Sequence, residues 1–279
     1  MPLPLPIHRR LPRPSVVGIV NVTPDSFSDG GLHLEPEAAA RAAREMIADG
    51  AALVDVGGES TRPGSSGVSA EEELRCVVPV LERLAGVPVS VDTSKAEVAR
   101  RALALGAELV NDVTALRGDP ELAGVVADAG AYLCLVHMLG EPRTMQEAPV
   151  YEDVVSEVAA FLEERLAAAT AAGIREERIC LDPGIGFGKT VAHNVELLRR
   201  LDVLVRLGRP VLIGVSRKRT LGRLLGDPEA LVGSTAASVG AAVAAFERGA
   251  AIFRVHDVRE HVEALTVAAA ICARERVRA

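Results

Sequence analysis

Short runs of apolar residues recur along the chain and alternate with longer stretches in which apolar residues are spaced three to four positions apart. The short runs are typical of buried β-strands, and the longer stretches are typical of amphipathic helices. Eight strands are predicted, at 16–20, 53–56, 87–91, 107–110, 131–136, 178–181, 210–215 and 251–255. Helices are predicted between and after them, at 36–49, 70–85, 95–105, 120–129, 151–172, 191–207, 230–248 and 257–275.

This alternation of strand and helix predicts the fold class. Each strand is followed by a helix, and a chain of 279 residues is long enough for eight such units. Ser69, Thr93 and Asp257 are suited to begin helices, because their side chains accept hydrogen bonds from free backbone N–H groups. Glycines suited to end helices stand at Gly50, Gly106, Gly130, Gly173 and Gly249. We therefore expect a single α/β domain over residues 15–279, a (β/α)8 TIM barrel, with a doubly wound open sheet as the alternative.

The first 14 residues differ from the rest, because they are rich in proline and arginine. They are predicted to form an extended lead-in that covers one end of the barrel. Prolines interrupt this segment where a signal peptide would need a continuous apolar run, and no run of about 18 apolar residues occurs anywhere. The four cysteines are far apart and form no CxxC motif, which argues against disulfides and zinc ligands. These features predict a soluble, cytoplasmic protein with no membrane partner.

Net charge and composition limit the classes of function that the protein could have. The formal net charge of −7, with arginines and glutamates interspersed, argues against a nucleic-acid surface, so any anion site must be local. Lysine and asparagine are rare, and a sequence that keeps so few of them is expected to use them where arginine or aspartate cannot serve. These residues are Lys95, Lys189, Lys218, Asn21, Asn111 and Asn194.

The catalytic groups of such barrels lie in the loops that follow the strands. The loops after the first and second strands (loops 1 and 2) are long and rich in Gly, Ser, Pro and Asp, so they are predicted to be mobile. Polar or uncommon side chains follow each of the other strands directly. They are Asp92, Asn111, His137 with Met138, Asp182, the run Ser216 to Arg219, and Arg254 with His256.

The loop DPGIGFGKT, from Asp182 to Thr190, is the most unusual stretch of the chain. It has glycines at alternate positions, Gly184, Gly186 and Gly188, and nothing in it is expected to help a core to pack. Glycines in this arrangement let the backbone turn sharply or lie close to another group. The loop is therefore predicted to serve a ligand, and the alternative is a turn that only connects a strand to a helix.

Four of the strand-end residues would converge over the mouth of a closed barrel. Asp92 and Asp182 accept hydrogen bonds, Lys218 donates them and Asn111 does both, which suits a flat heterocycle with an amino group, a ring N–H and a carbonyl. Asp92 could instead cap a helix, and Lys218 could be a surface lysine. Asp55, Asp112 and Glu59 are structural hydrogen-bond partners on an alternative interpretation.

Other residues suit a phosphate group. Arg254 and His256 are two positions apart, so on a strand they face the same side and could hold an anion together. Thr61 and Arg62 offer a hydroxyl group and a fork of N–H donors. Asn21, with Asp25 or Asp29, offers the oxygen ligands that Mg²⁺ accepts beside a diphosphate.

Seven motifs, in order from the first strand to the last, closely resemble the dihydropteroate synthase family. They are GIVNVTPDSFSDGG (18–31), DVGGESTRPGSS (55–66), SVDTSK (90–95), NDV (111–113), DPGIGFGKT (182–190), GVSRKR (214–219) and RVHDV (254–258). The resemblance implies condensation of 6-hydroxymethyl-7,8-dihydropterin diphosphate with p-aminobenzoate, which gives 7,8-dihydropteroate and pyrophosphate in folate biosynthesis. It also implies inhibition by sulfonamides, which imitate p-aminobenzoate, and a homodimer that uses the Ala- and Val-rich segments near 230–248 and 262–272.

The resemblance assigns roles to individual residues. The pterin would be held by Asp92, Asn111, Met138, Asp182 and Lys218. The diphosphate would be held by Asn21, Thr61, Arg62, Arg254 and His256, with Asn21 on a Mg²⁺ ion and Asp25 and Asp29 as helpers. The p-aminobenzoate pocket would be formed by Phe27, Thr61, Arg62, Pro63, Phe187, Ser216 and Lys218. The catalytic set would be Asn21, Asp92, Asp182, Lys218, Arg254 and His256.

The implied reaction needs no nucleophilic side chain if diphosphate leaves before the amine adds, because positive charge then develops on the pterin methylene group. Loops 1 and 2 would close to order the second substrate. Three alternatives remain at this stage. One is a methyltetrahydrofolate-binding domain of a corrinoid methyltransferase, the second is an aldolase-type barrel with Lys218 as a Schiff-base lysine, and the third is a non-catalytic pterin-binding homologue.

Overall fold

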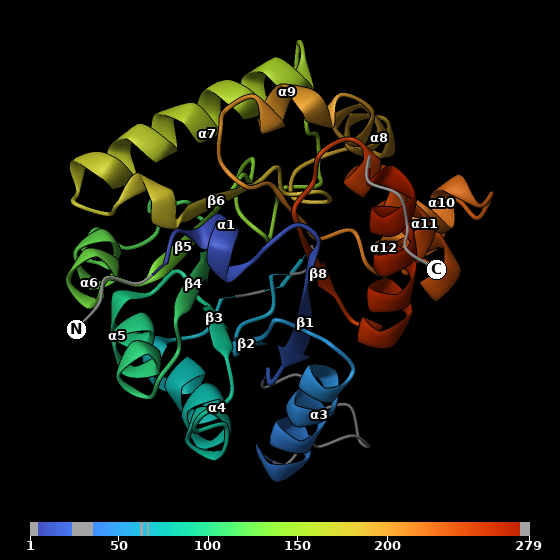
Figure 1. The fold of residues 1–279 in the computed structure, drawn as a ribbon. Coiled ribbons are helices and arrows are strands. Elements are labelled where there is room, and N and C mark those ends of the chain that lie inside the picture. The colour runs from blue at the N-terminus through green and yellow to red at the C-terminus, as the bar shows by residue number, and fades with distance from the viewer. Residues whose placement is uncertain (1–4, 24–35, 62–63, 66, 274–279) are drawn as a thin grey trace.

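The computed structural model describes residues 5–23, 36–61, 64–65 and 67–273. Eight parallel strands form one sheet in the order β6-β5-β4-β3-β2-β1-β8-β7. A parallel bridge between Leu181 and Val211 joins β6 to β7 and closes the sheet into a barrel. The predicted (β/α)8 barrel is confirmed, and the open-sheet alternative is wrong (Figure 1). The strands are β1 Ser15–Asn21, β2 Leu53–Gly57, β3 Val89–Asp92, β4 Leu109–Asp112, β5 Tyr132–Val136, β6 Ile179–Asp182, β7 Leu212–Ile213 and β8 Ile252–Val255.

Helices surround the strands on the outside (Figure 1). They are α3 Pro36–Ala48, α4 Ala70–Arg83, α5 Ala96–Ala104, α6 Leu122–Ala129, α7 Val154–Ala171, α8 Val191–Arg199, α9 Leu201–Val205, α10 Arg219–Leu224, α11 Thr235–Glu247 and α12 Val258–Cys272, with a short 3₁₀ turn, η1, at Glu176–Arg178. None of the helices in the described ranges is long and apolar enough to cross a membrane. The five glycines predicted to end helices all have positive φ, between 61° and 105°.

Strand residues alternate between two apolar clusters, and this alternation places the site. Val54 and Val110 face outward and pack under the helices. Leu53 and Leu109, one position earlier on the same strands, fill the barrel interior. Because side chains on a strand alternate between its two faces, Asp55 and Asn111 also face the interior, one layer above Leu53 and Leu109. The same spacing places Asp182 above Cys180 and Arg254 above Ile252.

The amino-terminal segment corrects the prediction of an extended lead-in. Residues Ile7–Arg10 form a short helix, α1, which lies across one end of the barrel (Figure 1). Ile7 and Leu11 are four residues apart, so they share a helix face, and both are buried in the interior cluster. Tyr132 of β5 donates a hydrogen bond from its hydroxyl group to the carbonyl of Leu5, at 2.7 Å. The segment covers the barrel end as predicted, but as a helix that completes its core.

Helix boundaries differ from the predictions at three places. Ser69 caps α4 with a capping box, as predicted, whereas the residue at the N-cap position of α5 is Lys95 rather than Thr93. The helix predicted at 191–207 is divided at Arg200 into α8 and α9. The helix predicted from 230 begins only at Thr235, after the Ser234 cap, and α10 was not predicted.

Candidate active site

Four of the five predicted pterin ligands, all polar, lie together where their strands end. Asp92 and Asp182 are the last residues of β3 and β6, Asn111 lies in β4, and Lys218 stands immediately before α10. Asn111 and Asp182 are less than a tenth exposed, and Asp92 and Lys218 are partly exposed. Lys218 interacts electrostatically with both Asp182 and Asp92. The structure therefore brings the predicted set into one polar cluster above the apolar interior.

Arg254 is the centre of this cluster. Its Nε donates to Oδ2 of Asp55 at 2.5 Å, and its Nη2 donates to Oδ2 of Asp92 at 2.6 Å. Asn111 Nδ2 donates to the same Asp55 oxygen at 3.2 Å. The two carboxylates raise the pKa of Arg254 further above its ordinary value, although burial opposes this. The interpretation of Asp55 as a structural partner is confirmed, and Arg254 reaches into the barrel mouth instead of standing free at the rim.

Burial shifts the pKa values of the two carboxylates in the predicted pterin set, Asp92 and Asp182. Burial raises the pKa of Asp92 to about 7, although Arg254 opposes the shift. Burial also raises the pKa of Asp182, while Lys218 and the backbone N–H of Gly184 oppose it. That N–H donates to Oδ1 of Asp182 at 2.7 Å. Within the described part of the chain, this leaves Oδ2 of Asp182 available to a ligand.

Lys218 lies where the two substrate pockets are expected to meet. Its Nζ donates to the carbonyl of Ile185 in the loop from Asp182 to Thr190, called the glycine loop below. The same Nζ lies 4.4 Å from the centre of the Phe187 ring. Burial lowers the pKa of Lys218 to about 8, while Asp182 opposes the shift. The alternative of an exposed surface lysine is therefore wrong.

Ser216 and His256 form a second pair at the rim. Oγ of the buried Ser216 lies 3.1 Å from Nδ1 of His256 and accepts the His256 backbone N–H at 3.2 Å. His256 follows β8 directly, two positions after Arg254. Two of the predicted diphosphate residues thus lie at the same end of β8, but Arg254 contacts carboxylates inside the mouth whereas His256 contacts the loop after β7.

The glycine loop corrects one expectation. Ile185 is fully buried in the outer apolar cluster, and Phe187 packs against the interior cluster. The prediction that nothing in this loop helps the core is therefore wrong. The loop packs against the barrel and also presents Phe187 and the Ile185 carbonyl to Lys218, and its role toward a ligand stays a prediction. Met138, which follows β5, is also buried in the interior cluster.

Loops 1 and 2 are described only in part. Asn21 ends β1, and Thr61 lies in loop 2; both side chains are partly exposed. The predicted ligands Asp25, Phe27, Asp29, Arg62 and Pro63 lie outside the described residues. The mobility of the two loops stays a prediction.

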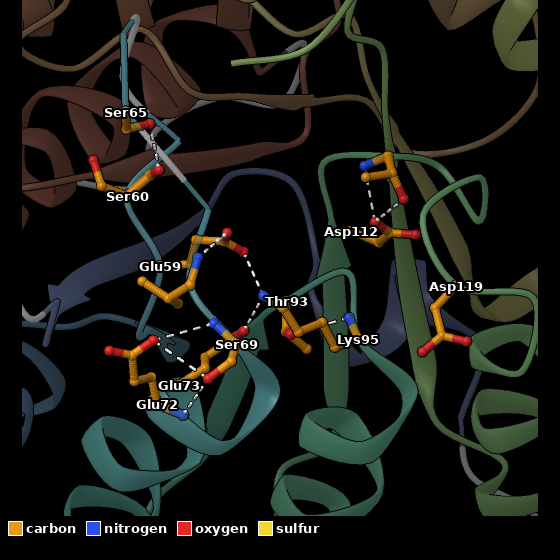
Figure 2. Close-up of polar contacts among 12 residues, drawn as sticks. Glu59, Ser60, Ser65, Ser69, Glu72, Glu73, Thr93, Lys95, Asp112 and Asp119 are labelled. Carbon is orange, nitrogen blue, oxygen red and sulfur yellow. Dashed lines mark hydrogen bonds and ion pairs between the residues drawn. The ribbon is translucent and has the colours of Figure 1, made fainter. Parts of the chain in front are cut away.

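The base of loop 2 is held by a cluster of charged residues (Figure 2). Lys95 Nζ contacts Glu59 Oε2 at 2.7 Å and Glu73 Oε2 at 2.6 Å. Glu59 Oε1 also accepts the backbone N–H of Val68 at 3.1 Å, which joins the two ends of the loop. Lys95 is thus a structural lysine, and the interpretation of Glu59 as a structural partner is confirmed.

Two more rim carboxylates have structural roles (Figure 2). Asp112 accepts hydrogen bonds from the backbone N–H groups of Thr114 and Leu116, at 2.8 and 2.6 Å, and so fixes the turn after β4. Asp119 Oδ2 accepts the N–H of Ala96 at 2.8 Å, in the first turn of α5. The alternative of a helix-capping role for Asp92 is therefore wrong, because Asp119 supplies that hydrogen bond.

Sequence reasoning missed the residues that support the glycine loop from outside. Gln146 Nε2 donates to the Gly186 carbonyl at 2.5 Å, and the Tyr151 hydroxyl donates to the Gly188 carbonyl at 2.9 Å. Both residues lie between β5 and α7. Gln146 lies in no predicted element, and Tyr151 was assigned to the helix predicted at 151–172, which begins only at Val154. Asn194 was marked only by the rarity of asparagine, and its Oδ1 accepts the Gly186 N–H at 2.8 Å.

Comparisons with known proteins agree with this geometry. The family model described as "Pterin binding enzyme" matches residues 17–256. The dihydropteroate synthase of Escherichia coli (strain K12) is 49% identical over 274 residues, which cover 96% of this chain and 95% of the relative. The Xanthomonas albilineans dihydropteroate synthase solved with 4-aminobenzoic acid is 53% identical, with a TM-score of 0.85 and coverage of 94% of both chains. The Yersinia pestis enzyme in a sulfonamide drug complex is 46% identical, with a TM-score of 0.87 and coverage of 94% and 95%. The chain belongs to the pterin-binding enzyme family and, within it, to the dihydropteroate synthases.

Proposed function

We propose that this barrel condenses 6-hydroxymethyl-7,8-dihydropterin diphosphate with p-aminobenzoate and releases pyrophosphate. The observation that carries the proposal is the cluster of Asp92, Asn111, Asp182 and Lys218 at the strand ends, in a chain about half identical to dihydropteroate synthases over nearly its whole length. The methyl-transfer, aldolase and non-catalytic alternatives are not favoured, because the relatives that cover the chain are named as synthases.

The pterin ring would lie over Arg254 in the barrel mouth. Asp92 and Asp182 would accept hydrogen bonds from its N–H and amino groups, and Lys218 would donate to its carbonyl. Asn111 Oδ1 is buried and has no hydrogen-bond partner among the described residues, so it would accept another pterin N–H group. Met138, which is buried in the interior apolar cluster and follows β5, would pack against the apolar part of the ring.

The diphosphate would extend from the pterin toward Asn21, Thr61, Arg62 and His256. The described residues contain no group of three or more His, Cys, Asp or Glu side chains that could hold a metal ion. This donor set fits a Mg²⁺ ion that binds together with the diphosphate, because Mg²⁺ keeps several waters and often uses one or two protein oxygens plus phosphate. The Asn21 amide oxygen would be a protein ligand, with Asp25 and Asp29 as helpers, and bound Mg²⁺ would neutralise charge on the leaving group.

The chain's own residues would favour loss of diphosphate before the amine adds. As the bond to the leaving oxygen lengthens, positive charge develops on the pterin methylene group, and the carboxylates of Asp92 and Asp182 stabilise it. Arg254 and His256 would stabilise the departing anion. The aryl amine of p-aminobenzoate would then attack the methylene carbon and lose a proton.

The p-aminobenzoate pocket would lie between the glycine loop and loops 1 and 2. Phe187 and Lys218 form its described wall, with the ammonium over the ring face, and Ser216 lies beside His256. Phe27, Thr61, Arg62 and Pro63 would complete it. A sulfonamide would occupy the same pocket, as the relative solved in a sulfonamide drug complex suggests.

Product analysis tests the proposed function. The protein is incubated with dihydropterin diphosphate, p-aminobenzoate and Mg²⁺, and the products are identified by mass spectrometry. We expect 7,8-dihydropteroate, and we expect a sulfonamide to inhibit its formation competitively with p-aminobenzoate. Pterin binding without dihydropteroate formation would contradict the synthase function and leave the pterin pocket standing.

The pH profile of kcat/KM is expected to be bell-shaped, with its maximum between about pH 7 and pH 8. Asp92, whose pKa is raised to about 7, must lose its proton to accept from the pterin. Lys218, whose pKa is lowered to about 8, must keep its proton to donate. Activity should therefore rise as Asp92 ionises and fall as Lys218 loses its charge. Asp92→Asn should remove the acidic limb, and an unchanged acidic limb would refute the role of Asp92.

We also propose that the protein is a cytoplasmic homodimer. Apolar side chains are exposed near α10 and along α12, namely Leu224, Leu225, Leu231, Val232, Val267 and Ile271. Helices α10, α11 and α12 lie on one side of the barrel (Figure 1), and a second copy would cover these side chains. Sedimentation equilibrium should give twice the chain mass, and Ile271→Asp should shift the protein toward the monomer. All four cysteines are free thiols, which supports a cytoplasmic location because disulfides are rare in the cytoplasm.

A further inference from the structure

Side chains satisfy five successive backbone carbonyls of the glycine loop. Each carbonyl from Gly184 to Gly188 accepts a hydrogen bond from a side chain. The donors, in order along the loop, are Lys189, Lys218, Gln146, Lys189 again and Tyr151. A loop of this kind has no ladder of its own, so these side chains determine its conformation.

Lys189 makes the largest share of these contacts. Its side chain is only 2% exposed. Its Nζ lies 3.1 Å from the Gly184 carbonyl, 3.0 Å from the Phe187 carbonyl and 2.8 Å from Nδ1 of His137. An ammonium group has three protons and accepts nothing, so three acceptors at these distances satisfy it. Burial lowers the pKa of Lys189 well below its ordinary value, and the Asp182 carboxylate opposes this shift.

His137 is held as an acceptor for this ammonium group. Burial, and then the nearby Lys189, lower the pKa of His137 to about 2, so the ring is neutral and Nδ1 can carry a lone pair. The edge-to-face contact with Phe161, with ring centres 4.7 Å apart, fixes the orientation of the ring. Because His137 follows β5 directly, Lys189 joins the loop after β6 to the loop after β5.

The glycines permit the close approach that this connection requires. A Cβ atom on Gly184 would lie 1.8 Å from the His137 carbonyl oxygen, and one on Gly188 would lie 2.5 Å from the Leu139 carbonyl oxygen. Both glycines also have positive φ, 66° and 64°. The glycine loop therefore lies directly against the backbone of the loop after β5, and no other residue type fits at these two positions.

The conformation of the loop fixes groups in the proposed site. Its Ile185 carbonyl accepts from Lys218, and its Phe187 ring lies beside the Lys218 ammonium group. Asn194 connects the loop to α10, since it accepts from Gly186 N–H and donates to Thr220 Oγ1 at 3.0 Å. A shift of the loop would therefore move Phe187 and Lys218 together.

We propose that Lys189 is a positioning residue for both substrates: its buried ammonium group, bound to two loop carbonyls and to His137, holds the glycine loop so that Phe187 and Lys218 face the pterin and p-aminobenzoate. This inference rests on the proposed function, because it concerns the same site. It adds a residue that touches neither substrate and acts through the loop backbone.

The test compares Lys189→Met with the matched variant Arg178→Met. Arg178 is also a buried cation, and its guanidinium donates to the carbonyl of another glycine, Gly130, but at the opposite end of β5 and β6. Both variants should lower the melting temperature. At a temperature where both are folded, Lys189→Met should raise the KM values for dihydropterin diphosphate and p-aminobenzoate about tenfold, because small misplacements at such a site have large kinetic effects. Arg178→Met should leave both KM values within twofold.

Two outcomes would overturn the inference. The first is Lys189→Met with both KM values within twofold of the parent, which would make Lys189 a stabilising residue only. If Lys189→Met does not fold, Gln146→Leu tests the same loop without removing a buried charge. The second outcome that would overturn the inference is a Gln146→Leu variant with both KM values unchanged. A parent protein that forms no dihydropteroate would instead refute the proposed function, so the two failures are distinguishable.

Discussion

Replacement of Asp182 by alanine is expected to lower kcat/KM for dihydropterin diphosphate about 10- to 100-fold. The Asp182 carboxylate ends β6 inside the barrel mouth, with Oδ1 used by the Gly184 N–H. Its remaining oxygen would accept from the pterin, and a hydrogen bond to a charged group contributes about 1.5–3 kcal/mol. The loss should appear in pterin affinity, measured by fluorescence titration, as well as in turnover.

The matched control for this variant is Asp119→Ala. Asp119 is another carboxylate near the rim, and it accepts the Ala96 N–H at the start of α5. Its loss should lower stability by about 1 kcal/mol, as for other helix caps, and leave kcat/KM unchanged. Turnover of Asp182→Ala within about threefold of the parent would remove Asp182 from the pterin site.

Replacement of Arg254 by methionine is expected to lower the free energy of unfolding by about 3–5 kcal/mol at pH 8, because it leaves two buried carboxylates without their cation. Arg254 contacts Asp55 and Asp92, and the Asp55 side chain is 1% exposed. Urea unfolding followed by circular dichroism measures the loss. The same variant should bind dihydropterin diphosphate poorly, because the guanidinium would lie beneath the ring and next to the diphosphate.

The pH dependence of this loss gives a second test. Burial raises the pKa of Asp92 to about 7 even with Arg254 present, and removal of the arginine raises it further. A carboxyl group whose folded pKa is raised binds protons more tightly in the folded state, so its contribution to stability falls as pH rises above the unfolded value of about 4. The destabilisation by Arg254→Met should therefore be smaller at pH 5 than at pH 8.

Asp55→Asn in the same chain should restore part of the stability at pH 8. A loss below about 1 kcal/mol at pH 8 would contradict the buried ion pairs.

The positions of the strand-end residues could be predicted from sequence because two periodicities fix them. Apolar alternation along a strand determines which residues face the interior, and closure of the barrel brings the strand ends together. Asp55, Asn111, Asp182 and Arg254 all follow an interior apolar residue by two positions. The interior positions of Asn111 and Asp182 therefore follow from the pattern, whereas Asp92 follows Ser90 and Lys218 lies in the loop after β7.

The partners of those residues could not be predicted in the same way. The sequence placed Arg254 and His256 on one strand face and suggested a shared anion site. Only the structure shows that Arg254 reaches Asp92 and Asp55, whereas His256 lies beside Ser216. The reach of a long side chain depends on which neighbours are buried beside it, and periodicity carries no information about that.

Irregular segments explain the remaining differences. The strand predicted at 210–215 forms a ladder only over Leu212–Ile213. Just before it the pairing with β8 is irregular, since the Val211 carbonyl accepts from the N–H groups of both Ala251 and Ile252. The first helix, α1, was missed because its prolines dominate the local pattern, although Ile7 and Leu11 have helical spacing. Lys189 was marked by its rarity, but no sequence pattern could show that it points into the protein.

Pyrophosphate release is the most direct test of the synthase function. It should be measured from dihydropterin diphosphate with and without p-aminobenzoate, and with and without Mg²⁺, while dihydropteroate is quantified in the same samples. We expect that sustained release needs all three components and that the two products form in equal amounts. Release that is independent of p-aminobenzoate and yields no dihydropteroate, or no release at all, would contradict the assignment of this barrel as a working synthase.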